Sequence, residues 1–86
     1  MKTMNSNFIG SPTELISTAN KELVENGASY LSFDFYNKED CVVQINNSEN
    51  IFLFAAQGFS FTSNIDYIFS FKIVTANVTF NFIAKQ

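Results

Sequence analysis

The sequence predicts a mainly β protein, a small antiparallel β-sandwich or jelly-roll-like barrel of six to eight short strands. Ten of the eleven phenylalanines occur in F-x-F triplets, and a spacing of two places both rings on one face of a strand. Turn residues separate the short apolar segments at regular intervals, which is typical of sandwiches and barrels. A single sheet cannot shield ten phenylalanine rings from water, whereas two facing sheets can. The triplets are Phe33/Phe35, Phe52/Phe54, Phe59/Phe61, Phe69/Phe71 and Phe80/Phe82.

The length of 86 residues favours one domain with a single core. We expect residues 1–10 to form an N-terminal arm, tied to the body by Phe8 and Ile9, and residues 11–86 to form the β-sandwich domain. The polar N-terminus lacks the apolar segment of a signal peptide. We therefore expect a protein made in the cytoplasm without a secretion signal.

Residues 12–24 are compatible with two structures. Ser11-Pro12-Thr13-Glu14 has the form of a capping box with proline at the first helical position, and the apolar residues that follow fit one helical face. Against a helix, Asn26-Gly27 is a strong hairpin signal. The alternative to a short helix is a pair of strands at 14–18 and 22–24.

From residue 28 onward, alternating apolar residues predict strands separated by polar turns. In the first strand, Leu31, Phe33 and Phe35 are expected to face inward. In the second, Cys41 and Val43 should share one face with Ile45. The expected strands are 28–36, 41–45, 51–56, 59–61, 67–74 and 78–84.

The last two of these strands are expected to pair with each other across the turn Thr75-Ala76-Asn77. Their facing residues would be Phe69, Phe71 and Ile73 on one strand and Val78, Phe80 and Phe82 on the other.

The segment 51–56 differs from the other strands because it is apolar on both faces. It should be a central strand covered on both sides, or a strand whose outer face meets a partner. With Phe52 and Phe54 inside, Ile51 and Leu53 face outward, or the reverse. In a domain of this size one of the two faces is hard to cover, which indicates a neighbouring copy or a larger partner.

Composition argues against catalytic, metal and nucleic-acid sites. The chain has five lysines, no arginine, no histidine and one cysteine, and its net charge is −3. Nucleic acids and anionic membranes both require clustered basic residues, and zinc sites or nucleophile–base pairs require histidine or several thiols. The longest apolar run is also too short to span a membrane. We expect no enzyme, no cofactor and no metal, and we interpret Cys41 as a small apolar strand residue.

Four segments of the chain resemble small β-sandwich structural modules of tailed-phage virions. The segments are Gly27–Phe33, Cys41–Asn47, Ile51–Phe59 and Ser70–Val74. Such modules serve as capsid decoration, head-fibre or tail-associated subunits and are all-β throughout, which shifts the expectation at 12–24 toward strands and leaves both structures open. The sequence departs from their pattern at Asn46-Asn47, where Asn-Gly is common, and this leaves the type of that turn open.

We therefore expect a non-enzymatic virion structural protein of a tailed phage. It would form homo-oligomers and attach to capsid or tail subunits through its apolar strand faces and its N-terminal arm. The alternative is a carbohydrate-binding or host-attachment module that uses exposed tyrosines as stacking platforms. The candidate interface residues are Phe8, Ile9, Tyr30, Tyr36, Ile51, Leu53 and Tyr67.

Overall fold

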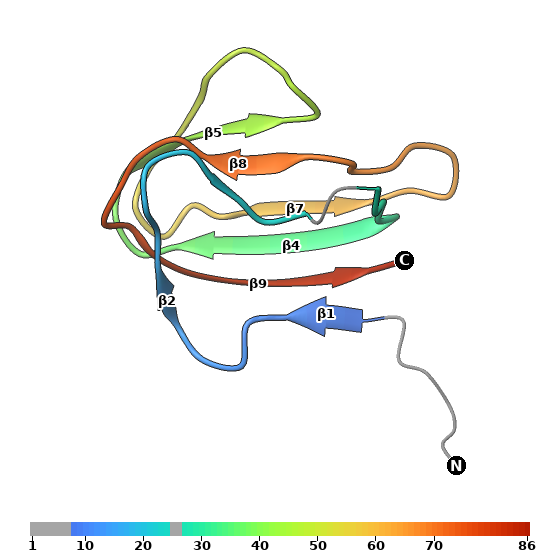
Figure 1. Ribbon diagram of the computed structural model, residues 1–86, viewed down its shortest axis with the longest axis horizontal. Coiled ribbons are helices and arrows are strands. Elements are labelled where there is room, and N and C mark those ends of the chain that lie inside the picture. The colour runs from blue at the N-terminus through green and yellow to red at the C-terminus, as the bar shows by residue number, and fades with distance from the viewer. Residues whose placement is uncertain (1–7, 25–26) are drawn as a thin grey trace.

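Nine short strands make up the regular structure of the computed structural model, which describes residues 8–24 and 27–86 (Figure 1). Within those two ranges there is no helix, and every strand pairing is antiparallel. The prediction of a mainly β protein is therefore confirmed. The strands are β1 (Phe8–Gly10), β2 (Leu15–Ile16), β3 (Lys21–Glu22), β4 (Ser32–Asn37), β5 (Cys41–Ile45), β6 (Ile51–Leu53), β7 (Phe59–Thr62), β8 (Phe71–Ile73) and β9 (Thr79–Lys85).

The strands form two sheets that face each other. The five-stranded sheet has the order β1-β9-β4-β7, with β2 also paired to β9, and the four-stranded sheet has the order β3-β8-β5-β6. The chain passes repeatedly from one sheet to the other, so that the consecutive strands β4 and β5 lie in different sheets. This arrangement confirms the predicted small antiparallel β-sandwich.

Aromatic rings fill the space between the two sheets. Phe71 on β8 lies with its ring centroid 4.8 Å from those of Phe33 and Phe35 on β4, and 5.7 Å from that of Phe59 on β7. Phe33 and Phe71 are completely buried, and Phe80 nearly so. Burial of one such side chain stabilises a fold by about 1.5–3 kcal/mol, so these rings dominate the core of a small domain.

Residues 12–24 form strands rather than a helix. β2 pairs with β9, and β3 pairs with β8, at positions far along the chain. Between them the buried Ser17 donates its hydroxyl to the Thr75 carbonyl oxygen (2.8 Å) and accepts from the Val78 amide (3.0 Å). Asn20 has a φ of 58°, which is incompatible with a continuous right-handed helix. Pairing with β8 and β9 thus overrides the local helical signals.

The strand expected at 67–74 is shorter than predicted, because β8 begins only at Phe71. The side chain of Asn46 holds the preceding segment: its Oδ1 accepts from the Phe69 amide (2.8 Å), and its Nδ2 donates to the Tyr67 carbonyl oxygen (2.9 Å). Phe69 is exposed as a result, and its prediction as an inward residue was wrong. Leu31 is also exposed, against expectation, because the buried Tyr30 interrupts the alternation just before β4.

β8 and β9 do not form the expected hairpin. β8 lies between β3 and β5 in one sheet, while β9 pairs with β4 in the other. The link 74–78 therefore crosses from sheet to sheet, where the contacts of Ser17 hold it. Phe71 and Phe80 still point into the same core, but from opposite sides.

The turn at Asn46-Asn47 has positive φ at both central residues, 52° and 60°. The Ser48 amide closes it by donating to the Ile45 carbonyl oxygen at 2.9 Å. Two successive positive φ angles define a type I′ turn, the one that Asn-Gly also favours. Of the expected arm, residues 8–10 form β1, while residues 1–7 lie outside the described part of the chain.

Candidate interaction surfaces

The structure separates the predicted interface residues into exposed and buried groups. Tyr30 and Leu53 are only 3% and 5% exposed, so neither contributes a surface as the structure stands. Tyr30 pairs with Ile68 through an isolated bridge, and Leu53 turns inward beside its partner Cys41. The exposed candidates are Phe8, Ile9, Tyr36, Ile51 and Tyr67.

The first surface is the β6 edge, which we define as β6 together with the exposed rings of Phe52 and Phe54. Among the described strands, β6 pairs with β5 alone and so ends the four-stranded sheet. Of the two orientations open to this segment, the structure adopts the one with Leu53 inside, and Phe52 and Phe54 are 51% and 67% exposed. Their ring centroids lie 5.0 Å apart in an edge-to-face arrangement. This orientation puts the larger side chains in water.

The backbone of the β6 edge has a pair of groups directed away from the sheet. Val42 on β5 is the partner of Phe52. The Val42 amide donates to the Thr75 hydroxyl and its carbonyl oxygen accepts from Val74, so both of its backbone groups face β8. In an antiparallel ladder the partner of such a residue directs its own N–H and C=O outward. Phe52 therefore presents one donor and one acceptor at the open edge.

Hydrogen bonds hold the loop that follows β6 in one conformation. The buried Asn37 donates its Nδ2 to the carbonyl oxygens of Phe54 (2.8 Å) and Glu39 (2.9 Å), and its Oδ1 accepts from the Gly58 amide (2.8 Å). The Phe54 amide in turn donates to Gln57 Oε1 at 2.8 Å. The exposed ring of Phe54 is thus carried by an ordered backbone. No sequence pattern indicates this role for Asn37, which falls at the start of a polar turn.

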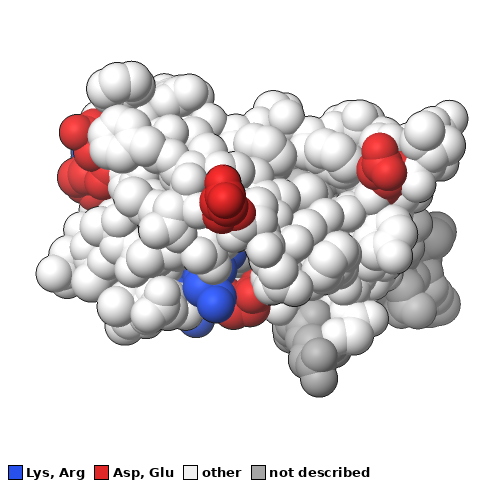
Figure 2. Space-filling view, turned by 90° about the horizontal axis from the view of Figure 1, so that it is seen from above, with Lys and Arg blue, Asp and Glu red and all other residues white. Residues whose placement is uncertain are grey.

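Charge is sparse on the side of the molecule where β5 lies. Figure 2 looks onto this side from above and shows mainly uncharged surface, with a few separated acidic groups and little basic surface. The segment 51–58 contributes no charged side chain at all. Since edge strands are commonly protected by charged residues, an uncharged edge with exposed rings is unusual for a free surface.

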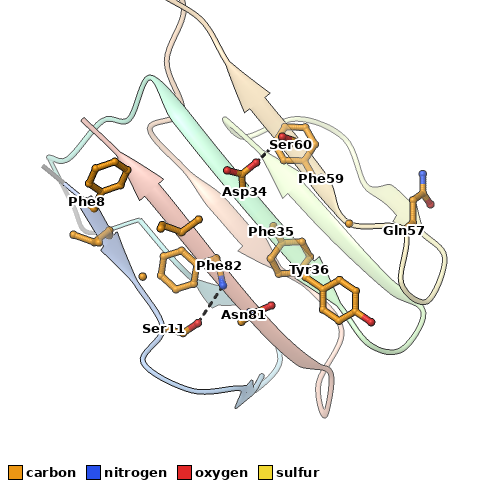
Figure 3. A pocket seen from close by; sticks show the side chains of 14 residues that line it. Phe8, Ser11, Asp34, Phe35, Tyr36, Gln57, Phe59, Ser60, Asn81 and Phe82 are labelled. Carbon is orange, nitrogen blue, oxygen red and sulfur yellow. Dashed lines mark hydrogen bonds between the residues drawn. The ribbon is translucent and has the colours of Figure 1, made fainter.

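The second surface is a groove of about 770 Å³ on the outer face of the five-stranded sheet, which we call the sheet-face groove. Figure 3 shows Phe8 of β1 on one side and Gln57 on the other, with Asp34 and Tyr36 between them. Its volume lies within the range of small-molecule sites. Of the three tyrosines predicted as interface residues, Tyr36 is the one that lines the sheet-face groove.

A further exposed aromatic pair lies away from the sheet-face groove. The rings of Tyr67 and Phe69 are 6.0 Å apart and both are about half exposed. They border a smaller hollow of about 520 Å³ with Ile45 and Phe61. Because its exposure is similar, the Tyr67/Phe69 pair can serve as a control for the Phe52/Phe54 pair on the β6 edge.

The thiol of Cys41 is buried, and the neighbouring carboxylates of Asp40 and Glu39 bind backbone amides. Burial raises the pKa of the Cys41 thiol, and the neighbouring carboxylates of Asp40 and Glu39 raise it further. Those carboxylates accept backbone hydrogen bonds, Asp40 from Ala55 (2.7 Å) and Glu39 from Thr79 (2.6 Å). Over residues 8–24 and 27–86, no three His, Cys, Asp or Glu side chains gather as metal ligands would.

Comparison with known proteins adds no relationship: no protein-family model, no curated protein and no solved structure matches this chain. The described residues also include no helix with the length and hydropathy that crossing a membrane requires.

Proposed function

We propose that this protein is a non-enzymatic structural subunit of a tailed-phage virion, and that it assembles with further copies of itself through the β6 edge. The observation that carries the proposal is the exposure of Phe52 and Phe54 on an uncharged edge strand. The wider virion setting is supported by the sequence resemblance to small β-sandwich modules of phage capsids and tails.

Exposure of two phenylalanine rings leaves a substantial free energy available for association. Full burial of an exposed phenylalanine side chain is worth about 1.5–3 kcal/mol, and Phe52 and Phe54, which are 51% and 67% exposed, retain the corresponding part of it for association. Asn37 and Gln57 already fix the loop that carries Phe54, so little conformational entropy is lost when this surface is covered. An ordered apolar surface of this kind favours a protein partner over solvent.

A second copy of the same chain matches the geometry of the edge. The outward N–H and C=O of Phe52 form a self-complementary pair, so two β6 strands related by a two-fold axis can exchange these hydrogen bonds. The aromatic pairs of the two copies would then meet on either side of the axis. Because β6 is only three residues long, the rings supply most of the contact and the backbone sets the register.

The proposed assembly is tested by the molar mass of the purified protein in light scattering over a range of concentrations. The wild-type chain should form dimers or larger assemblies, and the double variant Phe52→Ser/Phe54→Ser should be monomeric. The matched control is Tyr67→Ser/Phe69→Ser, which removes a second exposed aromatic pair and should leave the assembly unchanged. A strictly monomeric wild-type protein, or equal loss of assembly in both double variants, contradicts the proposal.

The virion setting requires a separate experiment. Mass spectrometry of purified phage particles from the source should detect this chain in stoichiometric amounts. Its presence in the lysate but not in the particles would rule out a structural role in the virion, whatever its oligomeric state.

A further inference from the structure

We propose that the sheet-face groove binds a neutral saccharide, with Tyr36 as the stacking platform and Asp34 and Asn81 as the hydrogen-bonding groups. This site lies on the five-stranded sheet, whereas the β6 edge belongs to the four-stranded sheet. The inference therefore does not depend on the assembly proposed above.

Strand register places the proposed contact residues side by side on the outer face. Asp34 on β4 is the partner of Ile83 on β9 and of Ser60 on β7, and Tyr36 is the partner of Asn81 on β9. Cross-strand partners share a face of the sheet. Three inter-strand spacings, from β1 to β7, give the groove a width of roughly 14 Å, which is more than a single sugar ring occupies.

Polar groups in the groove remain available for a ligand. Among residues 8–24 and 27–86, the side chains of Tyr36 and Asn81 form no hydrogen bond. Asp34 Oδ1 accepts from the Ser60 hydroxyl at 2.5 Å, which leaves Oδ2 unused. Gln57 Oε1 accepts from Phe54, which leaves its amide nitrogen unused. Figure 3 shows the side chains of Asp34, Tyr36, Gln57 and Asn81 around the groove.

This set of groups matches the chemistry of sugar hydroxyls. Each hydroxyl both donates and accepts, so it needs acceptors and donors close together. Carboxylate and amide oxygens supply the acceptors, while the amide nitrogens of Asn81 and Gln57 supply the donors. The apolar faces of Tyr36 (42% exposed) and Ile83 (48% exposed) supply a surface for the C–H groups of a sugar ring.

Charge selects a neutral ligand over an anionic one. Among the described lining residues, Asp34 is the one charged side chain, and no lysine lines the groove. Lys85 Nζ lies 5.8 Å from the centroid of the Phe8 ring, and Lys85 is not itself a lining residue of the groove. A phosphate, sulfate or carboxylate in the groove would face the Asp34 carboxylate, and none of the described lining residues carries a compensating positive charge.

Two glycines allow the walls of the groove to approach the sheet closely. A Cβ atom at Gly10 would lie 2.8 Å from the Phe82 carbonyl oxygen, and one at Gly58 would lie 2.8 Å from the Phe35 carbonyl oxygen. Gly58 also has a φ of 69°, which favours glycine. The glycines thus bring β1 and the loop before β7 against β9 and β4 without side chains that would fill the hollow.

The test uses the full chain on a glycan array that presents neutral, sialylated and sulfated oligosaccharides, followed by NMR titration of the strongest neutral trisaccharide. We expect a neutral ligand to bind and to shift the amide signals of Asp34, Gly58, Ser60 and Asn81. Tyr36→Ala should weaken binding by about tenfold or more. Asn81→Ala should also weaken it and is a second, independent variant in case Tyr36→Ala disturbs folding.

Tyr67→Ala serves as the matched control, because Tyr67 is as exposed as Tyr36 but lies outside the groove. It should bind the trisaccharide with unchanged affinity. The inference is overturned if no neutral glycan binds, if only sialylated or sulfated glycans bind, or if Tyr36→Ala and Asn81→Ala bind as tightly as the wild-type chain.

Discussion

The β6 edge and the sheet-face groove are two surfaces of opposite character on one small sandwich. The edge is uncharged and aromatic, and its Phe54 ring is carried by an ordered loop. The groove is lined by both polar and apolar side chains, with one carboxylate, the amides of Asn81 and Gln57, and Tyr36 as its single tyrosine. In the two proposals, self-association and ligand recognition are assigned to different sheets of the same fold.

The two surfaces nevertheless depend on some of the same residues for their structure. Phe71 packs the sheets together, and Asn37 bonds both to Phe54, which belongs to the β6 edge, and to Gly58, which lines the groove. Substitutions at these residues therefore test whether the surfaces depend on common structure, whereas other substitutions separate them.

The largest effect is expected from Phe71→Ala. Phe71 is fully buried and its ring contacts three aromatic rings of the opposite sheet, so its removal should lower the free energy of unfolding by about 4 kcal/mol. Urea denaturation followed by circular dichroism measures this change. Both surfaces should be lost together. An exposed phenylalanine, Phe69→Ala, is the control, and a similar loss in both variants would contradict the assigned core.

Asn37→Ala should cost about 3 kcal/mol of unfolding free energy, because it leaves three backbone groups without their buried partner. It should also reduce both assembly and saccharide binding, since the loop supports both surfaces. Asn81→Ala is the matched control in the groove, where an exposed amide should have little effect on stability. If Asn37→Ala is no less stable than Asn81→Ala in urea, the supporting role of Asn37 is wrong.

A smaller effect is expected from pH through Cys41. Burial raises the folded-state pKa of this thiol above its ordinary value of 9.0. The folded state therefore retains a proton that the unfolded state releases, so this contribution to stability is fully present below pH 9.0 and is lost as pH rises toward the folded-state pKa. The slope should be at most about 1.4 kcal/mol per pH unit.

Urea titrations between pH 7.5 and 10 measure this slope, with Cys41→Ala as the comparison. The variant should have a shallower decline over that range, and the wild-type thiol should react with a disulfide reagent only on unfolding. Identical pH profiles, or rapid labelling of the folded protein, would be inconsistent with a buried protonated thiol.

The smallest effect is expected from Gln57→Ala, which removes one exposed hydrogen bond to the Phe54 amide. The loss of stability should be about 1 kcal/mol or less. Assembly should weaken, because Phe54 is held less firmly, while the core stays intact. Concentration-dependent light scattering detects the change. An unchanged association constant would show that the order of this loop is unimportant for the β6 edge.

The alternation of apolar residues predicted the fold class and most of the core. Phe33 and Phe35 lie inward as expected, and Cys41 and Val43 share the buried face of β5. Local patterns could not predict that β8 and β9 belong to different sheets, because pairing partners are selected by packing over the whole chain. The same limit applies to residues 12–24, whose helical signals are overridden by pairing with β8 and β9.

Side-chain hydrogen bonds account for most of what the sequence did not reveal. Asn46 and Asn37 look like ordinary turn residues, yet Asn46 holds the segment before β8 outside the strand and Asn37 anchors the loop after β6. The segment 51–56 was identified as a candidate interface, but Leu53 is buried and Phe52 is exposed. Periodicity alone leaves both orientations open when each face of a strand is apolar.

The most direct test of the central claim is hydrogen exchange at the Phe52 amide, measured by NMR at low and high protein concentration. If two β6 edges pair, this N–H should exchange freely in the dilute monomer and become protected as the concentration rises, while the Tyr67 amide should show no such dependence. Free exchange of the Phe52 amide at concentrations where the protein is oligomeric would contradict assembly through the β6 edge.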